Sequence, residues 1–214
     1  GSAVASVAAG GAAAFLSSGT WSLLGTEIDA PVITAQARDL NFTNEGGVCG
    51  TTRLLKNVMG LWMLQCCRQC WSVQGRDYSY TELMDLAVRE PAFKHLVDPN
   101  DESFLHPASM PEAIGAFCVK TQQPKPSGAG AYVRAILESL ALKYAAVIAE
   151  LEQLTKQPIT AIRVIGGGSK NRLLNQFTAD ATARKVVAGP AEATALGNLA
   201  MQMLATGEAS SLAD

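Results

Sequence analysis

From residue 160 onward the chain alternates between two kinds of element, and this order limits the possible folds more than any other feature. A β-branched segment at 160–165 precedes a helix-like pattern at 170–184, which is followed by a short strand pattern at 185–188 and a second helix-like pattern at 192–206. Such alternation is typical of a parallel or mixed sheet with helices packed on it. We therefore expect an α/β fold.

Upstream of residue 160, periodicity and turn residues predict the remaining elements. Residues 13–28 are rich in strand formers around Ser18-Gly19, which predicts a β-hairpin. Residues 52–74 carry a wide apolar stripe and are predicted as one long helix, with Gly60 inside it permitting a close approach. Further helices are expected at 80–90, at 111–121 and at 131–155, the first of them with Thr81 as N-cap. Residues 29–50 are expected to form a loop with a short strand, ending in a flexible Glu45-Gly46-Gly47. With no internal repeat or long linker, these elements predict one compact domain.

The composition excludes several classes of function. Hydrophobic residues make up 48% of the 214 and charged residues 17%, which favours a packed core over disorder. A net charge of −2 provides no basic face for nucleic acid, and no long apolar run predicts a membrane span. The five cysteines lack the paired spacing of a zinc site, so we expect reduced thiols in a cytoplasmic protein.

Residues 1–16 resemble the apolar region of a signal peptide, but they lack an initiator Met and a basic leading segment. We interpret them as part of a chain cut from a longer protein rather than as a targeting signal.

A glycine loop, VIGGGSKNRLLNQ at 164–176, joins a predicted strand to a predicted helix. Glycines let a ligand approach the backbone, and the first turn of a helix offers N–H groups to an anion. Ser169 is the expected N-cap. Asn171 replaces the third glycine of a dinucleotide fingerprint, and the Walker A order is absent. Taken alone, the loop is compatible with a nucleotide contact and with a structural turn.

A second turn of small residues, Ser17-Ser18-Gly19-Thr20, makes the nucleotide interpretation stronger. It offers hydroxyl and backbone N–H groups at the predicted bend of the hairpin. Two glycine–hydroxyl loops in one α/β domain suggest a nucleotide held between them.

Six sequence blocks, in order along nearly the whole chain, resemble the FGGY carbohydrate kinases. They are LSSGTWSL at 16–23, NEGG at 44–47, LKNVMGLWMLQ at 55–65, DPNDESFLHPASMP at 98–111, IGGGSKNRLLNQFTADAT at 165–182 and AGPAEATALGN at 188–198. The resemblance covers the C-terminal half of that family. It implies an actin/hexokinase-like ATPase domain, with a ribonuclease H-like sheet and packed helices. Residues 1–214 would then be the nucleotide-binding domain, without the N-terminal sugar-binding domain.

The resemblance also implies roles for particular residues. Thr20, Gln65, Gly167 and Gly168 match positions that contact ATP, and Asn57 matches a position assigned to the sugar. Structural alternatives stay open. The Thr20 hydroxyl could instead bond only within its own turn. Asn57 and Gln65 share one face of the predicted helix and could instead be ordinary solvent-exposed polar residues.

The activity implied by the resemblance is transfer of the γ-phosphoryl group of ATP, with Mg²⁺, to a ketose hydroxyl. L-Rhamnulose is the expected sugar; another ketose such as xylulose or fuculose, and a non-catalytic module of the same fold, are the alternatives. In the members of the family that act on L-rhamnulose, the base is the Asp of a His-Asp-Thr motif, which the resemblance leads us to expect just upstream of Gly1. No catalytic base or metal ligand is therefore assigned within the chain, and the chain alone is expected to be inactive.

The expected partners are ATP, the ketose and the N-terminal domain, with no nucleic acid and no membrane. Loss of that domain would expose the face that meets it, so self-association is a further expectation.

Overall fold

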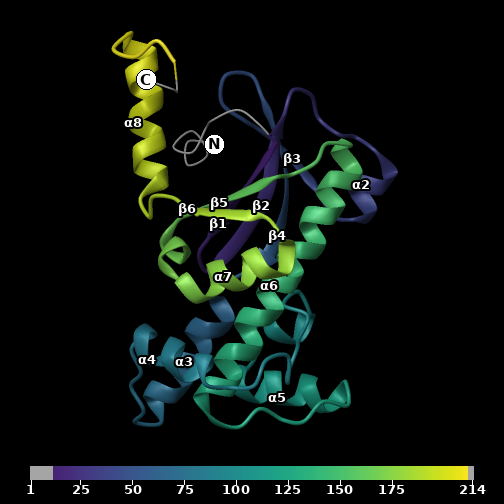
Figure 1. The fold of residues 1–214 in the computed structure, drawn as a ribbon, viewed down its shortest axis with the longest axis vertical. Helices are drawn as coiled ribbons and strands as arrows, with labels where there is room; N and C mark the ends of the chain where they lie inside the picture. The colour runs from purple at the N-terminus through teal and green to yellow at the C-terminus, as the bar shows by residue number, and fades with distance from the viewer. Residues whose placement is uncertain (1–11, 212–214) are drawn as a thin grey trace.

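The computed structural model describes residues 12–211, which form a sheet joined to a helical region (Figure 1). The strands are β1 (Ala13–Ser18), β2 (Trp21–Ile28), β3 (Thr43–Gly46), β4 (Thr52–Met59), β5 (Ala161–Ile165) and β6 (Lys185–Ala188). The helices are α2 (Ala35–Asp39), α3 (Trp62–Val73), α4 (Tyr80–Val88), α5 (Met110–Lys120), α6 (Gly128–Thr155), α7 (Arg172–Thr182) and α8 (Ala193–Thr206), with the 3-10 helices η1 (Glu102–Phe104) and η2 (Gly167–Lys170). The segment compared with a signal peptide lies mostly outside the described residues.

The sheet is mixed, with strand order β3-β4-β2-β1-β5-β6. The first four strands along the chain pair antiparallel, whereas β1, β5 and β6 run parallel. The predicted hairpin is confirmed as β1 and β2, and the predicted β–α–β–α order after residue 160 is confirmed as β5, α7, β6 and α8.

The predicted helix over 52–74 is wrong in its first half, which is strand β4. This strand pairs along its whole length with β2. Leu54 and Val58 lie in the main core, whereas Leu55 packs with Phe15 in a separate cluster. A strand buried on both faces lacks a clean apolar alternation. The spacing of four between Leu54 and Val58 fits a strand as well as a helix, so the stripe was ambiguous.

Gly60 lies between β4 and α3 rather than inside a helix, yet the close approach predicted for it is present. A Cβ on Gly60 would lie 2.7 Å from the carbonyl oxygen of Gly19 and 2.7 Å from Ser22 Oγ. Any side chain would therefore push the start of α3 away from the hairpin.

Two predicted N-caps are wrong. Helix α4 is capped by Ser79, not Thr81: the Ser79 hydroxyl accepts from the N–H of Glu82, whose carboxylate accepts from the N–H of Ser79. Helix α7 is capped by Asn171 because the predicted cap, Ser169, lies two residues earlier in η2. In both cases a second capping residue stood two positions away, and local sequence did not separate the two.

The segment 29–50 contains more structure than the expected loop and short strand, because it holds α2 as well as β3. Glu45 was expected in a flexible loop. It belongs to β3, and its carboxylate forms an ion pair with Arg53 on the neighbouring strand over 2.6 Å.

Helix α6 organises the packing of the molecule. Over half of its 28 residues are buried. It packs against β2 and β4 of the sheet and against α3, α4 and α7, and Figure 1 shows it running from the sheet into the helical region. Helix α8 extends away from this body. No described helix has the length and apolar character needed to cross a membrane.

Candidate nucleotide-binding site

A cavity of ≈ 920 Å³ opens between α3, α4 and the segment from η2 to α7. Its apolar wall includes Leu64, Met84, Val88 and Leu173. Its polar lining includes Gln65, Asp85, Lys170 and Gln176. Pockets for small molecules usually measure about 300–1,000 Å³, with mostly apolar walls and a few polar groups. The cavity has this character and is large enough for a nucleotide.

The two loops of small residues lie side by side at this cavity. Strands β1 and β5 are parallel neighbours, so the loops that follow them leave the same edge of the sheet. A Cβ on Gly166 or on Gly168 would lie 2.9 Å from the carbonyl oxygen of Ser18. Gly19 from the hairpin and Gly167 and Gly168 from η2 all line the cavity. Segments about 150 residues apart in the sequence thus form one continuous surface.

Thr20 and Gln65 contact each other at the rim of the cavity. Thr20 Oγ1 donates to Gln65 Oε1 over 3.2 Å, and Gln65 lines the cavity. The hairpin turn also caps α3, because the carbonyl oxygens of Gly19 and Thr20 accept from Leu61 N (2.9 Å) and Trp62 N (3.0 Å). The first two N–H groups at the start of α3 are therefore satisfied by the hairpin turn.

The glycine loop is fixed by its own hydrogen bonds. Ser169 N donates to the carbonyl of Gly166, and Asn171 N to that of Gly168. Asn175 Nδ2 donates to the Ser169 carbonyl over 2.8 Å, which ties the loop to α7. The loop therefore has a defined shape before any ligand binds.

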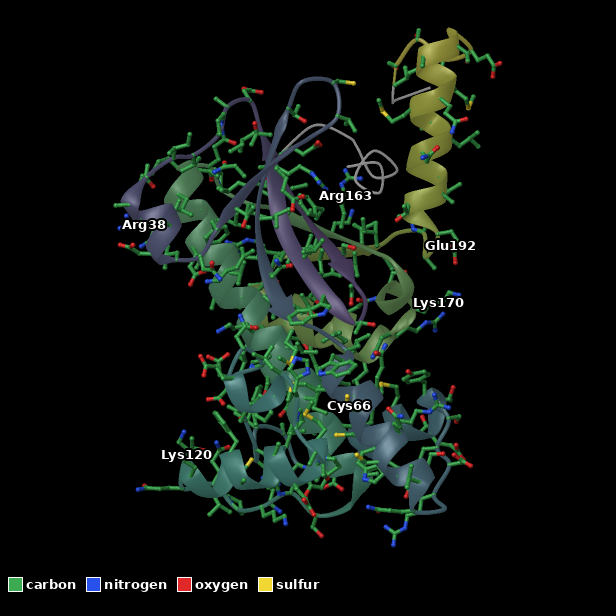
Figure 2. All side chains as sticks on the ribbon, turned by 180° about the vertical axis from the view of Figure 1, so that it is seen from behind. Arg38, Cys66, Lys120, Arg163, Lys170 and Glu192 are labelled. Atoms are coloured by element: carbon green, nitrogen blue, oxygen red, sulfur yellow. The ribbon has the colours of Figure 1, made fainter. Side chains whose placement is uncertain are left out.

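The three glycines of this loop differ in their surroundings. Gly166 has φ = +82°, which an L-residue adopts only with strain. Gly168 has no room for a side chain, because its Cβ would collide with the hydroxyl of Ser18. Gly167 differs, since a Cβ there would meet nothing within 4 Å. Its backbone faces open space, which fits a site where phosphate groups approach the main chain. Lys170, labelled in Figure 2, is the last residue of η2 and also lines the cavity.

Asn57, matched above to a sugar contact, lies apart from this group. It is an exposed residue of β4, opposite Leu23 in the ladder, and is not among the described residues that line the cavity. The predicted helix face shared with Gln65 does not exist, because Asn57 is on a strand and Gln65 on a helix. Between residues 12 and 211, no group of three or more His, Cys, Asp or Glu side chains is placed to hold a metal ion.

The cysteines of α3 lie on the helix that carries Gln65, and all five described cysteines are free thiols. Burial raises the pKa of Cys67 well above its usual value, and the neighbouring Cys70 and Cys66 thiols add to this effect. Burial likewise raises the pKa of Cys66, labelled in Figure 2. Raised pKa values keep these groups as thiols, so they are not activated nucleophiles.

Sequence reasoning missed the wall that α4 contributes. Leu83 and Ala87 of this helix face the core, whereas Tyr80, Asp85 and Val88 line the cavity. The signal available was weak: Tyr80 and Val88 are apolar residues on the exposed face of a short amphipathic helix. No motif connects them to the glycine loops.

Comparison with known proteins shows the family to which this chain belongs. The model for the FGGY family of carbohydrate kinases, C-terminal domain, matches residues 14–206. The chain belongs to the FGGY family. A rhamnulokinase from Bacteroides thetaiotaomicron is 54% identical over 200 residues, covering 94% of this chain and 40% of that protein. A rhamnulokinase from Enterococcus faecalis is 50% identical over 197 residues, covering 91% and 39%. The chain thus spans about two fifths of the length of these FGGY relatives.

Solved structures support the same fold. A ligand-bound xylulose kinase from Lactobacillus acidophilus superposes with a TM-score of 0.70 at 17% identity, covering 99% of this chain and 42% of that one. Gluconate kinase from the same organism also gives 0.70. At these identities the likeness concerns the fold alone, and it confirms the expected α/β, actin/hexokinase-like fold.

Proposed function

We propose that this chain is the C-terminal, nucleotide-binding domain of a kinase that transfers a phosphoryl group from ATP to L-rhamnulose, giving L-rhamnulose 1-phosphate. One observation carries the nucleotide part: Gly19, Gln65, Gly167 and Gly168, from three distant segments, line one cavity of suitable size. The choice of sugar is supported by the names of the relatives, several of which are rhamnulokinases.

Within this proposal the chain binds and orients the nucleotide. The apolar side chains of Leu64, Met84 and Leu173 provide surfaces for the base. The open backbone at Gly167 receives phosphate oxygens, and Lys170 adds positive charge beside them. The bond between Thr20 and Gln65 holds the hairpin turn in position.

Mg²⁺ bound with ATP supplies charge neutralisation at the phosphates. No described cluster of acidic side chains provides a separate cage for it. The sugar contacts and the catalytic carboxylate are proposed to belong to the N-terminal domain, with Asn57 as the contribution of this chain to the sugar. Under this proposal the chain alone binds MgATP weakly and does not phosphorylate the ketose.

The variant Gly167→Val tests the nucleotide site. A Cβ on residue 167 would meet no protein atom within 4 Å, and Gly167 lines the cavity, so a valine there takes up space beside the bound phosphates without disturbing the fold. We expect the melting temperature to stay unchanged and the Kd for MgATP, measured by isothermal titration calorimetry, to rise at least about tenfold, or about 1.4 kcal/mol.

Gly46→Val is the matched control for this experiment. A Cβ on Gly46 would also meet open space, but this residue lies in β3, away from the cavity. Both the wild type and this control are expected to bind MgATP equally well. No binding by the wild type, or equal binding by Gly167→Val, would reject the site.

A further inference from the structure

Three hydroxyl groups lie together directly below the two glycine loops. Ser18 and Ser22 are opposite each other in the β1–β2 ladder, so their side chains are on the same face of the hairpin. Ser22 Oγ and Tyr144 Oη of α6 share a buried hydrogen bond of 2.7 Å. All three residues are at most 1% exposed. The hairpin is thus joined to α6 at the point where it turns toward the cavity.

The Ser18 hydroxyl differs from the other two because its hydrogen-bonding capacity is unused. Ser18 Oγ lies near enough to Tyr144 Oη for a weak polar interaction that lowers the pKa of that phenol, but the geometry falls short of a hydrogen bond, and no other described residue bonds to this hydroxyl. A buried hydroxyl without a partner has lost its hydrogen bonds to water and formed none within the protein, which costs free energy of folding. Such groups are rare in native proteins, and each calls for an explanation. Stability of the free chain gives no reason for a serine here, since alanine would avoid the cost.

The location of Ser18 supplies the explanation. It is the last residue of β1 and immediately precedes the Gly19–Thr20 turn. The backbone of Gly168 rests on its side chain, because a Cβ on Gly168 would collide with Ser18 Oγ and lie 2.7 Å from Ser18 Cβ. The unused hydroxyl therefore lies beneath the loop whose other side lines the cavity.

We propose that Ser18 is a positioning residue whose hydroxyl is reserved for the nucleotide-bound state. When phosphate groups engage the open backbone at Gly167, a small rotation of the loop backbone above Ser18 lets Ser18 Oγ hydrogen bond to the Gly167–Gly168 backbone, with no closer approach of the loop to β1. The bond between Tyr144 and Ser22 keeps the hairpin in place during this rotation. Ser18 itself does not touch the nucleotide. The inference rests on the proposed function, because it takes the cavity as the nucleotide site.

This arrangement separates stability from affinity. A hydrogen bond that forms only in the complex contributes nothing to the free chain and its full free energy to binding. A hydroxyl with a purely structural role would stabilise the free chain and leave the affinity for the nucleotide unchanged. Removal of the Ser18 hydroxyl therefore distinguishes the two roles.

The test compares Ser18→Ala with Ser139→Ala in the 214-residue chain. For Ser18→Ala we expect an unchanged or higher melting temperature, and a Kd for MgATP about tenfold higher by calorimetry. Ser139 is the matched control, a buried serine of α6 whose Oγ accepts from Val97 N over 2.9 Å. Its alanine variant should melt at a lower temperature and bind MgATP as the wild type does.

Hydrogen exchange gives a second readout that a structural role would not move. MgATP should slow exchange of the Gly167 and Gly168 amides in the wild type, and do so less in Ser18→Ala. Wild-type affinity in Ser18→Ala, or a loss of melting temperature like that of Ser139→Ala, would overturn the inference. If the wild-type chain itself binds no MgATP, the proposed function fails, and this inference fails with it.

Discussion

At the residue scale, Tyr144 makes the stability of the folded chain depend on pH. Burial raises the pKa of Tyr144 to about 12, against the opposing effect of the Ser22 and Ser18 hydroxyls. The unfolded chain has a tyrosine pKa near 10. Between pH 10 and 12 the unfolded chain therefore releases a proton that the folded chain keeps, so stability falls as pH rises through this window.

This pH dependence can be measured directly. Urea unfolding of the wild type should lose on the order of 3 kcal/mol of stability between pH 10 and 12 beyond the loss seen in Tyr144→Phe. The phenylalanine variant is less stable at pH 8, because Ser22 loses its partner, but it lacks this titration. Parallel stability curves for the two proteins would contradict the assignment.

At the scale of the element, α4 is short, and its capping box is important for the cavity wall that it forms. We expect Ser79→Ala to lower the free energy of unfolding by about 1 kcal/mol, since the N–H of Glu82 in the first turn of α4 loses its acceptor. Thr81→Ala, two residues later, should change it by less than about 0.5 kcal/mol. Urea denaturation of both variants checks this, and equal losses would argue against Ser79 as the cap.

Elements with a clear local pattern were predictable, and those decided by long-range pairing were not. The hairpin and α6 follow from their own residues. Strand β4 does not, because Leu54 and Val58 fit both periodicities and only pairing with β2 decides between them. At the site, family resemblance pointed to Gly167, Gly168, Thr20 and Gln65, which the structure brings together. The α4 wall was unpredictable because its side chains reach the cavity only through packing on α6.

At the scale of the whole molecule, α6 and α8 represent opposite extremes of burial. Helix α6 buries over half its residues, whereas α8 buries only Ala193 and Gly197 and leaves Leu196 and Leu199 exposed. Amide hydrogens exchange through local opening, which is easiest where few apolar groups are buried. We expect the amides of α8 to exchange well before those of α6 in hydrogen-exchange mass spectrometry. Similar protection of both helices would show that α8 is packed in solution.

The unbroken length of α6 has a consequence for the kinetics of binding. With 28 residues it is about 42 Å long. Helices α4 and α7, which both contribute residues to the cavity lining, pack on α6. Because α4 and α7 both pack on one continuous helix, the distance between them is set when the protein folds. A ligand then enters without waiting for a slow opening step, and its rate of arrival depends on diffusion and orientation alone.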